Sequence, residues 1–228
     1  MGKKHMKTLT VPVSWPVKRK SSRFTLRPNP GKSFELSMPI ALVFKNLLRY
    51  AKTMKEVKTI LMDKEILVDG KRVKKPKQLV GLMDTVTIPI SNENYRMLIK
   101  KSKKLYITEI SKEEAKIKIC KITGKTLLKK GQVQINLFDG RNVLVKKDEF
   151  KVGDSVILSL PDQKIKSILK FEKGAYAFMI GGSHVGEHGI IEKIDERAII
   201  IKTKEDSFET PKSTVFVVGK SKSEIKLD

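Results

Sequence analysis

Apolar residues recur at helical spacing near residue 40, where they form one stripe: Ile40, Val43, Phe44, Leu47, Leu48 and Ala51. Ser37 is placed to cap this helix, with Pro39 in its first turn. The run Thr53-Met-Lys-Glu56 has the form of a capping box and begins a second helix. The core face of that helix consists of Val57, Ile60 and Leu61. The pattern therefore predicts two short amphipathic helices.

Elsewhere apolar and polar residues alternate with the period of two that is typical of strands. Asp69-Gly70 and Asp139-Gly140 each separate two such runs, and both dipeptides favour a two-residue hairpin turn. Further strands are expected at residues 85–88, 95–99, 105–110, 154–160, 164–171, 176–180, 189–194, 198–202 and 215–218. Short strands at this spacing indicate small barrels or sandwiches, so the expected class is α+β with several small modules.

The first 36 residues lack a periodic apolar pattern and contain four prolines, which oppose a long helix. Before Glu35 every charged side chain in this arm is basic: Lys3, Lys4, Lys7, Lys18, Arg19, Lys20, Arg23, Arg27 and Lys32. Such a segment buries too little apolar surface to offset its ordering entropy. We therefore expect the arm to order only against a partner and to contact that partner through these cations.

The charge balance suggests what the partner is. The chain of 228 residues has 48 Lys and Arg against 25 Asp and Glu, a formal net charge of +23. Such an excess favours binding to a polyanion, because phosphates neutralise the cations and release counterions. A solvated basic surface is the plain alternative. The helices add five candidate RNA contacts: Lys45, Arg49, Lys52, Lys55 and Lys58. Between Lys45 and Lys58 the only acidic residue is Glu56.

The sequence offers little for catalysis. Gly124-Lys125-Thr126 lacks the upstream glycine of a phosphate-binding loop, and no dinucleotide fingerprint is present. The one cysteine, Cys120, excludes a multi-cysteine zinc site and is expected to be a core thiol. No apolar run reaches the roughly 18 residues of a membrane span, and no signal peptide is recognisable. We expect a soluble intracellular protein without a cofactor, metal, membrane partner or small-molecule substrate.

A glycine-rich stretch, residues 181–191, is the other specific signal. Its candidate RNA contacts are Gly181, Gly182, His184, Gly186 and Gly189. Glycines permit positive φ and close approach to another backbone, so the loop can lie against a sugar-phosphate chain. A plain turn of a β-barrel is the alternative, and both can hold together. The run His184-Val-Gly-Glu-His188 matches an inverted zincin pattern, but its glycines oppose the helix that such a site needs.

Six motifs occur in order along the chain: Arg27–Gly31, Gly81–Asp84, Gln134–Asn142, Val152–Ser155, Lys164–Lys166 and Met179–Ile191. Together they resemble the archaeal and eukaryotic small-subunit ribosomal protein S4e family, collinearly from about residue 3 to residue 219. The last of these looks like the family's KOW motif, a β-barrel module, although Glu187 places an acid in it. The chain stops at Asp228, without the further basic extension of the eukaryotic forms, which favours an archaeal type.

The resemblance implies five segments: a basic arm (1–36), an S4-like RNA-binding module of two helices and a hairpin, the α-L type (37–100), a central β-rich domain (101–172), a KOW barrel (173–219) and a short flexible tail (220–228). It implies a non-enzymatic, cytoplasmic constituent of the small ribosomal subunit, whose partners are ribosomal RNA and other ribosomal proteins. The rival functions are a KOW-containing transcription or translation factor and an RNA-modifying enzyme. The enzyme would need a catalytic domain that the β-rich remainder does not offer.

Overall fold

The structure is a computed structural model that describes residues 5–128, 131–145, 148–195, 198–203 and 206–227. The chain divides into two compact units. The first comprises Met1–Ile99 and Lys103–Lys116, and the second comprises Lys100–Ser102 and Ile117–Asp228. No helix in the described ranges is long and apolar enough to span a bilayer.

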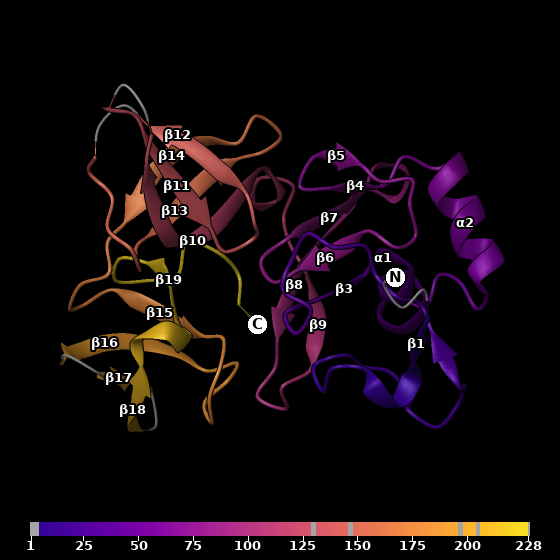
Figure 1. Ribbon diagram of the computed structural model, residues 1–228, viewed down its shortest axis with the longest axis horizontal. Coiled ribbons are helices and arrows are strands. Elements are labelled where there is room, and N and C mark those ends of the chain that lie inside the picture. Colours follow the sequence, from indigo (N-terminus) through magenta and orange to yellow (C-terminus); the bar gives the residue numbers. More distant parts are fainter. Residues whose placement is uncertain (1–4, 129–130, 146–147, 196–197, 204–205, 228) are drawn as a thin grey trace. The chain divides into compact units, whose positions relative to one another are not determined.

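The first unit, indigo to magenta in Figure 1, is built on an antiparallel sheet with the strand order β5-β4-β7-β8-β9. These strands are β4 (Leu67–Val68), β5 (Lys71–Arg72), β7 (Thr85–Ile88), β8 (Glu93–Ile99) and β9 (Leu105–Glu109). Two smaller pairs join β1 (Met6–Lys7) to β2 (Phe24–Thr25) and β3 (Ser37–Pro39) to β6 (Leu79–Gly81). The helical segments are η1 (Thr8–Thr10), α1 (Ile40–Leu42), η2 (Val43–Leu47), α2 (Met54–Asp63), η3 (Pro89–Ser91) and η4 (Glu114–Lys116).

The local signals for α2 and its hairpin are confirmed. The Thr53 side chain accepts from the Glu56 backbone N–H while the Glu56 carboxylate accepts from Thr53, which is the reciprocal capping box. Asp69 and Gly70 link β4 to β5 with φ angles of 51° and 72°, as a two-residue turn with two left-handed residues requires.

The expected start of the first helix is wrong. Ser37 lies in β3 and pairs with Gly81, so Pro39 instead holds the N-cap position of α1. The helix is also short, because after Leu42 the chain widens into a π-helical turn in which the Leu48 N–H bonds to Val43 O at 3.0 Å. The apolar stripe still faces inward, since Ile40, Val43 and Phe44 are fully buried.

The expectation that the basic arm orders only against a partner is also wrong. Trp15 is 1% exposed, and its indole N–H donates to Ser37 O at 2.7 Å. Val11 is buried as well, and the Lys32 ammonium forms an ion pair with the buried Asp84. The Thr8 N–H bonds to Arg23 O at 3.0 Å and closes the arm on itself. The arm therefore belongs to the core of the first unit, although most of its cations stay at the surface.

The second unit contains two five-stranded antiparallel sheets. The first has the order β12-β11-β10-β13-β14 and consists of β10 (Ile117–Leu127), β11 (Val133–Leu137), β12 (Asn142–Val145), β13 (Ser155–Ser159) and β14 (Lys164–Leu169). The second has the order β18-β17-β16-β15-β19 and consists of β15 (Tyr176–Met179), β16 (His188–Ile194), β17 (Ala198–Lys202), β18 (Ser207–Pro211) and β19 (Val215–Gly219), with the turn η6 (Lys212–Thr214) before β19.

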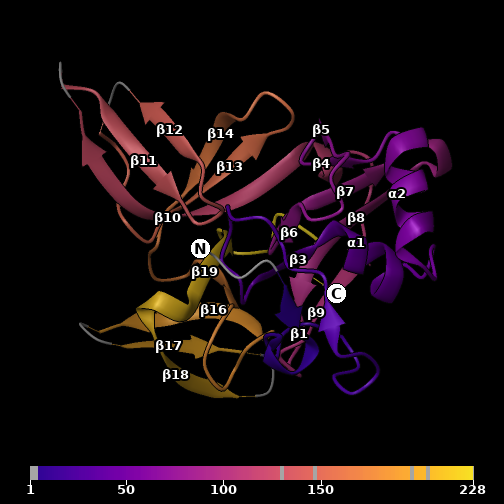
Figure 2. The same cartoon turned by 45° about the vertical axis from the view of Figure 1, so that its right-hand side comes forward.

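Strand β10 organises the first of these sheets, and Figure 2 shows it as a long curved strand. Its first half pairs with β13 and its second half with β11, with a β-bulge between Ile122 and Gly124. A bulge bends a strand and increases its twist, so one strand can serve both neighbours. The core under this sheet consists of Cys120, Ile122, Ile135, Leu137, Phe150, Val156 and Leu158. Cys120 is thus the buried core thiol that its alternating context predicts.

The hairpin at Asp139-Gly140 differs from the expected two-residue turn. The Leu137 N–H bonds to Arg141 O at 2.8 Å, so three residues form the loop. Asp139 is buried, and its carboxylate binds the buried Lys118 ammonium at 2.8 Å and Arg141 Nε at 3.2 Å. Burial alone would raise the pKa of Asp139, but Lys118 and Arg141 hold it below its usual value. The aspartate serves an internal ion pair as well as the turn.

A buried lysine links the two sheets of the second unit. Lys121 on β10 donates to Ser213 O at 2.9 Å and to Val215 O at 2.6 Å, at the start of β19. Burial lowers the pKa of Lys121 to about 8. The last residues also pack, contrary to the expected flexible tail, because Ile225 and Leu227 are buried and the Glu224 N–H bonds to Val218 O at 3.0 Å.

Candidate nucleic-acid interface

Most of the predicted RNA contacts are exposed cations of the first unit. In the arm, Lys32 is the exception, because it is half-buried and pairs with Asp84. The exposed cations of the arm are Lys7, Lys18, Arg19, Lys20, Arg23 and Arg27. Lys3 and Lys4 lie outside the described residues. The arm therefore presents a series of fixed cations, since its backbone is anchored through Trp15.

The helical cations also lie at the surface. Val57 and Leu61 of α2 are buried, whereas Lys55 and Lys58, three residues apart, are exposed together. Lys45 on η2 and Lys52 just before the capping box are exposed as well. The pattern of apolar positions thus correctly separates the buried face of α2 from its cationic face.

Arg49 occupies an unusual backbone position. Its φ angle is 59°, in the left-handed region, and the next residue, Tyr50, donates its N–H to Phe44 O at 3.0 Å. This bond joins residues six apart, one more than the bond of the usual C-terminal motif, and it follows the wider π-helical turn. The left-handed residue inside such a helix end is the position at which glycine is favoured. An arginine there is more strained than a glycine. The chain therefore places a guanidinium at a position where backbone strain alone would favour glycine.

A second group of exposed cations is not among the RNA contacts predicted from the sequence. The hairpin and the loop after it carry five exposed cations in seven residues: Lys71, Arg72, Lys74, Lys75 and Lys77. We call this group the 71–77 cluster. Arg72 also donates to Met62 O at 3.2 Å, which joins the hairpin to the end of α2. The run Lys71-Arg-Val-Lys-Lys-Pro-Lys77 was a readable signal, because it contains no acid.

The glycine-rich stretch has two kinds of glycine. Gly182 and Gly186 have φ angles of 82° and 80°, in the region that favours glycine. Gly189 is buried on β16, where a Cβ atom would clash with the carbonyl of Lys202 on β17. Gly181 packs against Thr214. The close approach made by Gly189 is therefore to the chain's own sheet, and of the four glycines Gly182 is the exposed one.

His184 is engaged within the same unit. Its ring stacks on Phe208 with centroids 3.8 Å apart and planes 6° apart, and its Nδ1 lies 3.2 Å from Glu187 Oε2. The segment turns before β16 and forms no helix, as its glycines predict. Within the described ranges, no three His, Cys, Asp or Glu side chains gather as a possible metal site.

Substitutions at the two kinds of glycine should differ in their effect on stability. Gly189→Ala should lower the melting temperature of the second unit, because the new methyl group meets the β17 backbone. Gly182→Ala should cost only the strain of a left-handed alanine, about 1–2 kcal/mol, because no atom lies within 4 Å of the added Cβ. Thermal melts followed by circular dichroism compare the two. A smaller loss for Gly189→Ala than for Gly182→Ala would contradict this assignment.

Comparison with known proteins places these features in one family. The family model described as "Ribosomal family S4e" matches residues 91–165. The model described as "RS4NT (NUC023) domain" matches residues 1–31, and the one described as "S4 domain" matches residues 46–86. The S4 match includes α2, the Asp69-Gly70 hairpin and the 71–77 cluster.

Relatives match over almost the whole length. The small ribosomal subunit protein eS4 of Methanocaldococcus jannaschii is 40% identical over 240 residues, covering 99% of this chain and 98% of the relative. That of Methanothermobacter thermautotrophicus is 40% identical over 234 residues, covering 99% and 96%. The crystal structure of the 30S ribosomal protein S4e from Thermoplasma acidophilum superposes with a TM-score of 0.72 and 31% identity, covering 82% of this chain and 96% of that one. The chain belongs to the ribosomal protein S4e family.

Proposed function

We propose that this protein is a structural constituent of the small ribosomal subunit, in the cytoplasm, and that it supports translation by binding ribosomal RNA. The observation that carries the proposal is the collinear match to eS4 relatives over 99% of the chain. The net charge of +23 supports it, because a protein embedded in RNA needs an excess of cations. The partners are small-subunit ribosomal RNA and other ribosomal proteins.

We assign the RNA contacts chiefly to the first unit. The S4-like module, in the role of an α-L RNA-binding motif, contributes the cations of η2 and α2 together with the 71–77 cluster, and the arm adds its exposed cations. These side chains stand on anchored backbone, so little further backbone entropy is lost when each meets a phosphate. The sheet formed by β15–β19 takes the role of the KOW module, with the exposed Gly182 and the half-buried Gly186 in the turn before β16. We assign no catalytic role to any residue.

Position should matter more than total charge. Reversing Lys45, Arg49 and Lys52 to Glu should weaken binding to transcribed small-subunit RNA more than reversing Lys220, Lys222 and Lys226. If all three residues of the first set contact phosphates, the slope of log affinity against log salt should also become about three units less steep. Filter binding at several salt concentrations measures both quantities.

The two triple variants change the net charge equally, so each controls for the other. Sedimentation with small subunits in cells provides the functional readout. Equal losses of RNA affinity would show that only total charge matters. A protein that neither binds this RNA nor sediments with small subunits would overturn the proposed function.

A further inference from the structure

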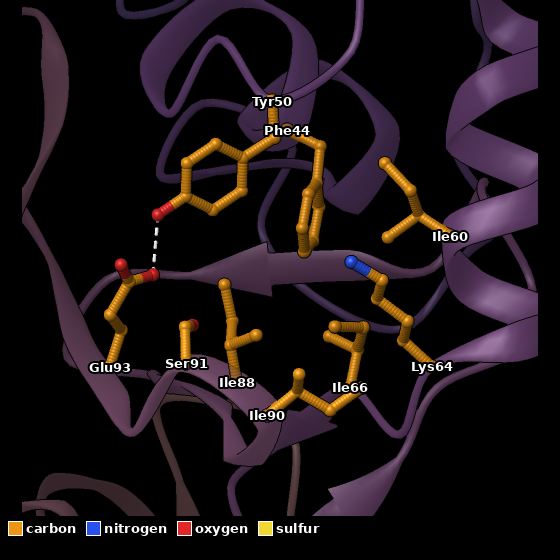
Figure 3. A pocket seen from close by; sticks show the side chains of 9 residues that line it. All are labelled: Phe44, Tyr50, Ile60, Lys64, Ile66, Ile88, Ile90, Ser91 and Glu93. Carbon is orange, nitrogen blue, oxygen red and sulfur yellow. Dashed lines mark hydrogen bonds between the residues drawn. The ribbon is translucent and has the colours of Figure 1, made fainter.

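The first unit contains a hollow of about 400 Å³, lined by residues of η2, α2 and the segment around η3. Its inner wall is apolar, and Phe44, Ile66 and Ile88 are buried there. In Figure 3 Lys64 reaches in from one side, while Glu93 lies on the opposite side. The hollow is thus apolar in the middle and carries opposite charges at its two ends.

Its rim is apolar and open to solvent. Tyr50 is 45% exposed and Ile90 is 65% exposed, although both line the hollow. The Tyr50 and Phe44 rings lie 6.2 Å apart at an angle of 53°. A concave apolar surface with a few polar groups at its edge is typical of a ligand site. The exposed Tyr50 ring gives a flat ligand a surface on which to stack.

The anionic end has a fixed geometry. The Tyr50 hydroxyl donates to Glu93 Oε2 and lies 3.3 Å from the Tyr95 hydroxyl. The bond from Tyr50 holds the pKa of Glu93 below its usual value, while burial and the same bond raise the pKa of Tyr50. At neutral pH the hollow therefore presents a carboxylate, which is an acceptor for N–H donors.

Two cations belong to the hollow or directly adjoin a lining residue in the chain. Arg49 directly precedes Tyr50 in the chain and is exposed, at the left-handed position where glycine would be less strained. Lys64 lines the hollow itself. A ligand with a flat apolar body, an N–H donor edge and a flanking negative charge matches all of these features. An unstacked nucleotide has this combination.

We propose that the hollow binds one unstacked base of ribosomal RNA that carries an amino group, namely adenine, cytosine or guanine. Uracil fits less well, because its one ring N–H lies between two carbonyl oxygens that the Glu93 carboxylate repels. The inference deepens the proposed RNA-binding function and rests on it. The base stacks on Tyr50, its amino group donates to Glu93, and Arg49 and Lys64 neutralise the flanking phosphates. An apolar side chain of a neighbouring protein fits less well, because it would bury the Glu93 carboxylate without supplying a donor.

Two variants of the full chain test the proposal. Tyr50→Ala removes the stacking surface and should lower affinity for transcribed small-subunit RNA by roughly 10-fold or more, with an unchanged salt slope, because no phosphate contact is lost. Glu93→Gln removes an acid from an RNA-binding surface, so electrostatics alone would tighten binding. If the hollow binds a base, Glu93→Gln should instead weaken RNA binding, since the charged acceptor of the amino group is lost. Leu144→Ala, at an exposed residue of the second unit, is the control.

Short oligoadenylate and oligouridylate provide a second readout. The wild type should prefer oligoadenylate, and Glu93→Gln should reduce this preference while Tyr50 stays in place. Melting temperatures near the wild-type value confirm that both changes leave the fold intact. Tighter RNA binding by Glu93→Gln, or unchanged affinity of Tyr50→Ala, would overturn the base pocket. A Tyr50→Ala variant that binds RNA normally but fails to enter small subunits would assign the hollow to a protein neighbour. Absence of RNA binding by the wild type would instead reject the proposed function.

Discussion

Trp15→Ala should lower the free energy of unfolding of the first unit by about 3–5 kcal/mol, the usual cost of removing a large aromatic side chain from a core. Trp15 is 1% exposed, and its indole N–H donates to Ser37 O at 2.7 Å. Removing it opens a cavity and also leaves that carbonyl without the indole donor. Deletion of residues 1–32 should cost at least as much, because Val11 and the ion pair of Lys32 with Asp84 are lost too.

Urea denaturation followed by circular dichroism measures the loss. The matched control is Val13→Ala, two residues away, because Val13 is 59% exposed and should change stability little. The chain contains one tryptophan, so the tryptophan fluorescence of the wild type reports on Trp15 alone. The fluorescence transition should accompany the unfolding of the first unit. A Trp15→Ala variant as stable as the wild type would restore the view that the arm orders only on a partner.

Local chemistry made some elements predictable from the sequence. The capping box at Thr53 and the turn at Asp69-Gly70 depend on residues next to each other in the chain, and both form as expected. The two helices were recognised from apolar periodicity, but the widening after Leu42 was not. The strand register that places Ser37 opposite Gly81 depends on a partner 44 residues away, which periodicity does not reveal.

Long-range burial explains the two larger errors. Val11 and Trp15 belong to a stretch in which apolar residues occupy every second position from Leu9 to Val17. Leu9 and Val13 in the same series are exposed while Val11 and Trp15 are buried, so this alternation does not identify the core residues. Ile225 and Leu227 in the basic tail are a similar case. The composition of the arm matches that of disordered segments, and composition alone therefore predicts disorder there. A single large aromatic residue can anchor such a segment when a preformed core accepts it.

The candidate site was recognised only in part, for a related reason. The helical period of apolar residues predicts the cations of η2 and α2. The 71–77 cluster lies on a short strand and a loop, where no helical period is present. The hollow beside Tyr50 could not be read from the sequence at all. Its lining comes from four separate segments between residues 44 and 93, and only folding brings Phe44, Ile66 and Glu93 together.

Affinity for small-subunit ribosomal RNA should fall by roughly 10³-fold or more between about 50 and 200 mM salt, if the protein neutralises about six or more phosphates. The structure offers enough cations for this, since the 71–77 cluster alone has five and the exposed residues of η2, α2 and the arm add others. Each phosphate neutralised releases condensed counterions, so log affinity should decrease linearly with log salt.

Competition filter binding over a salt series gives the slope, and a reversal of two or more cluster residues to Glu should make it less steep. The Tyr50→Ala variant separates the two kinds of contact, because stacking carries no counterion term. It should shift the line to weaker binding and leave its slope unchanged. A wild-type affinity that stayed constant across the series would contradict binding through phosphates. The excess of 48 basic over 25 acidic side chains would then need another explanation.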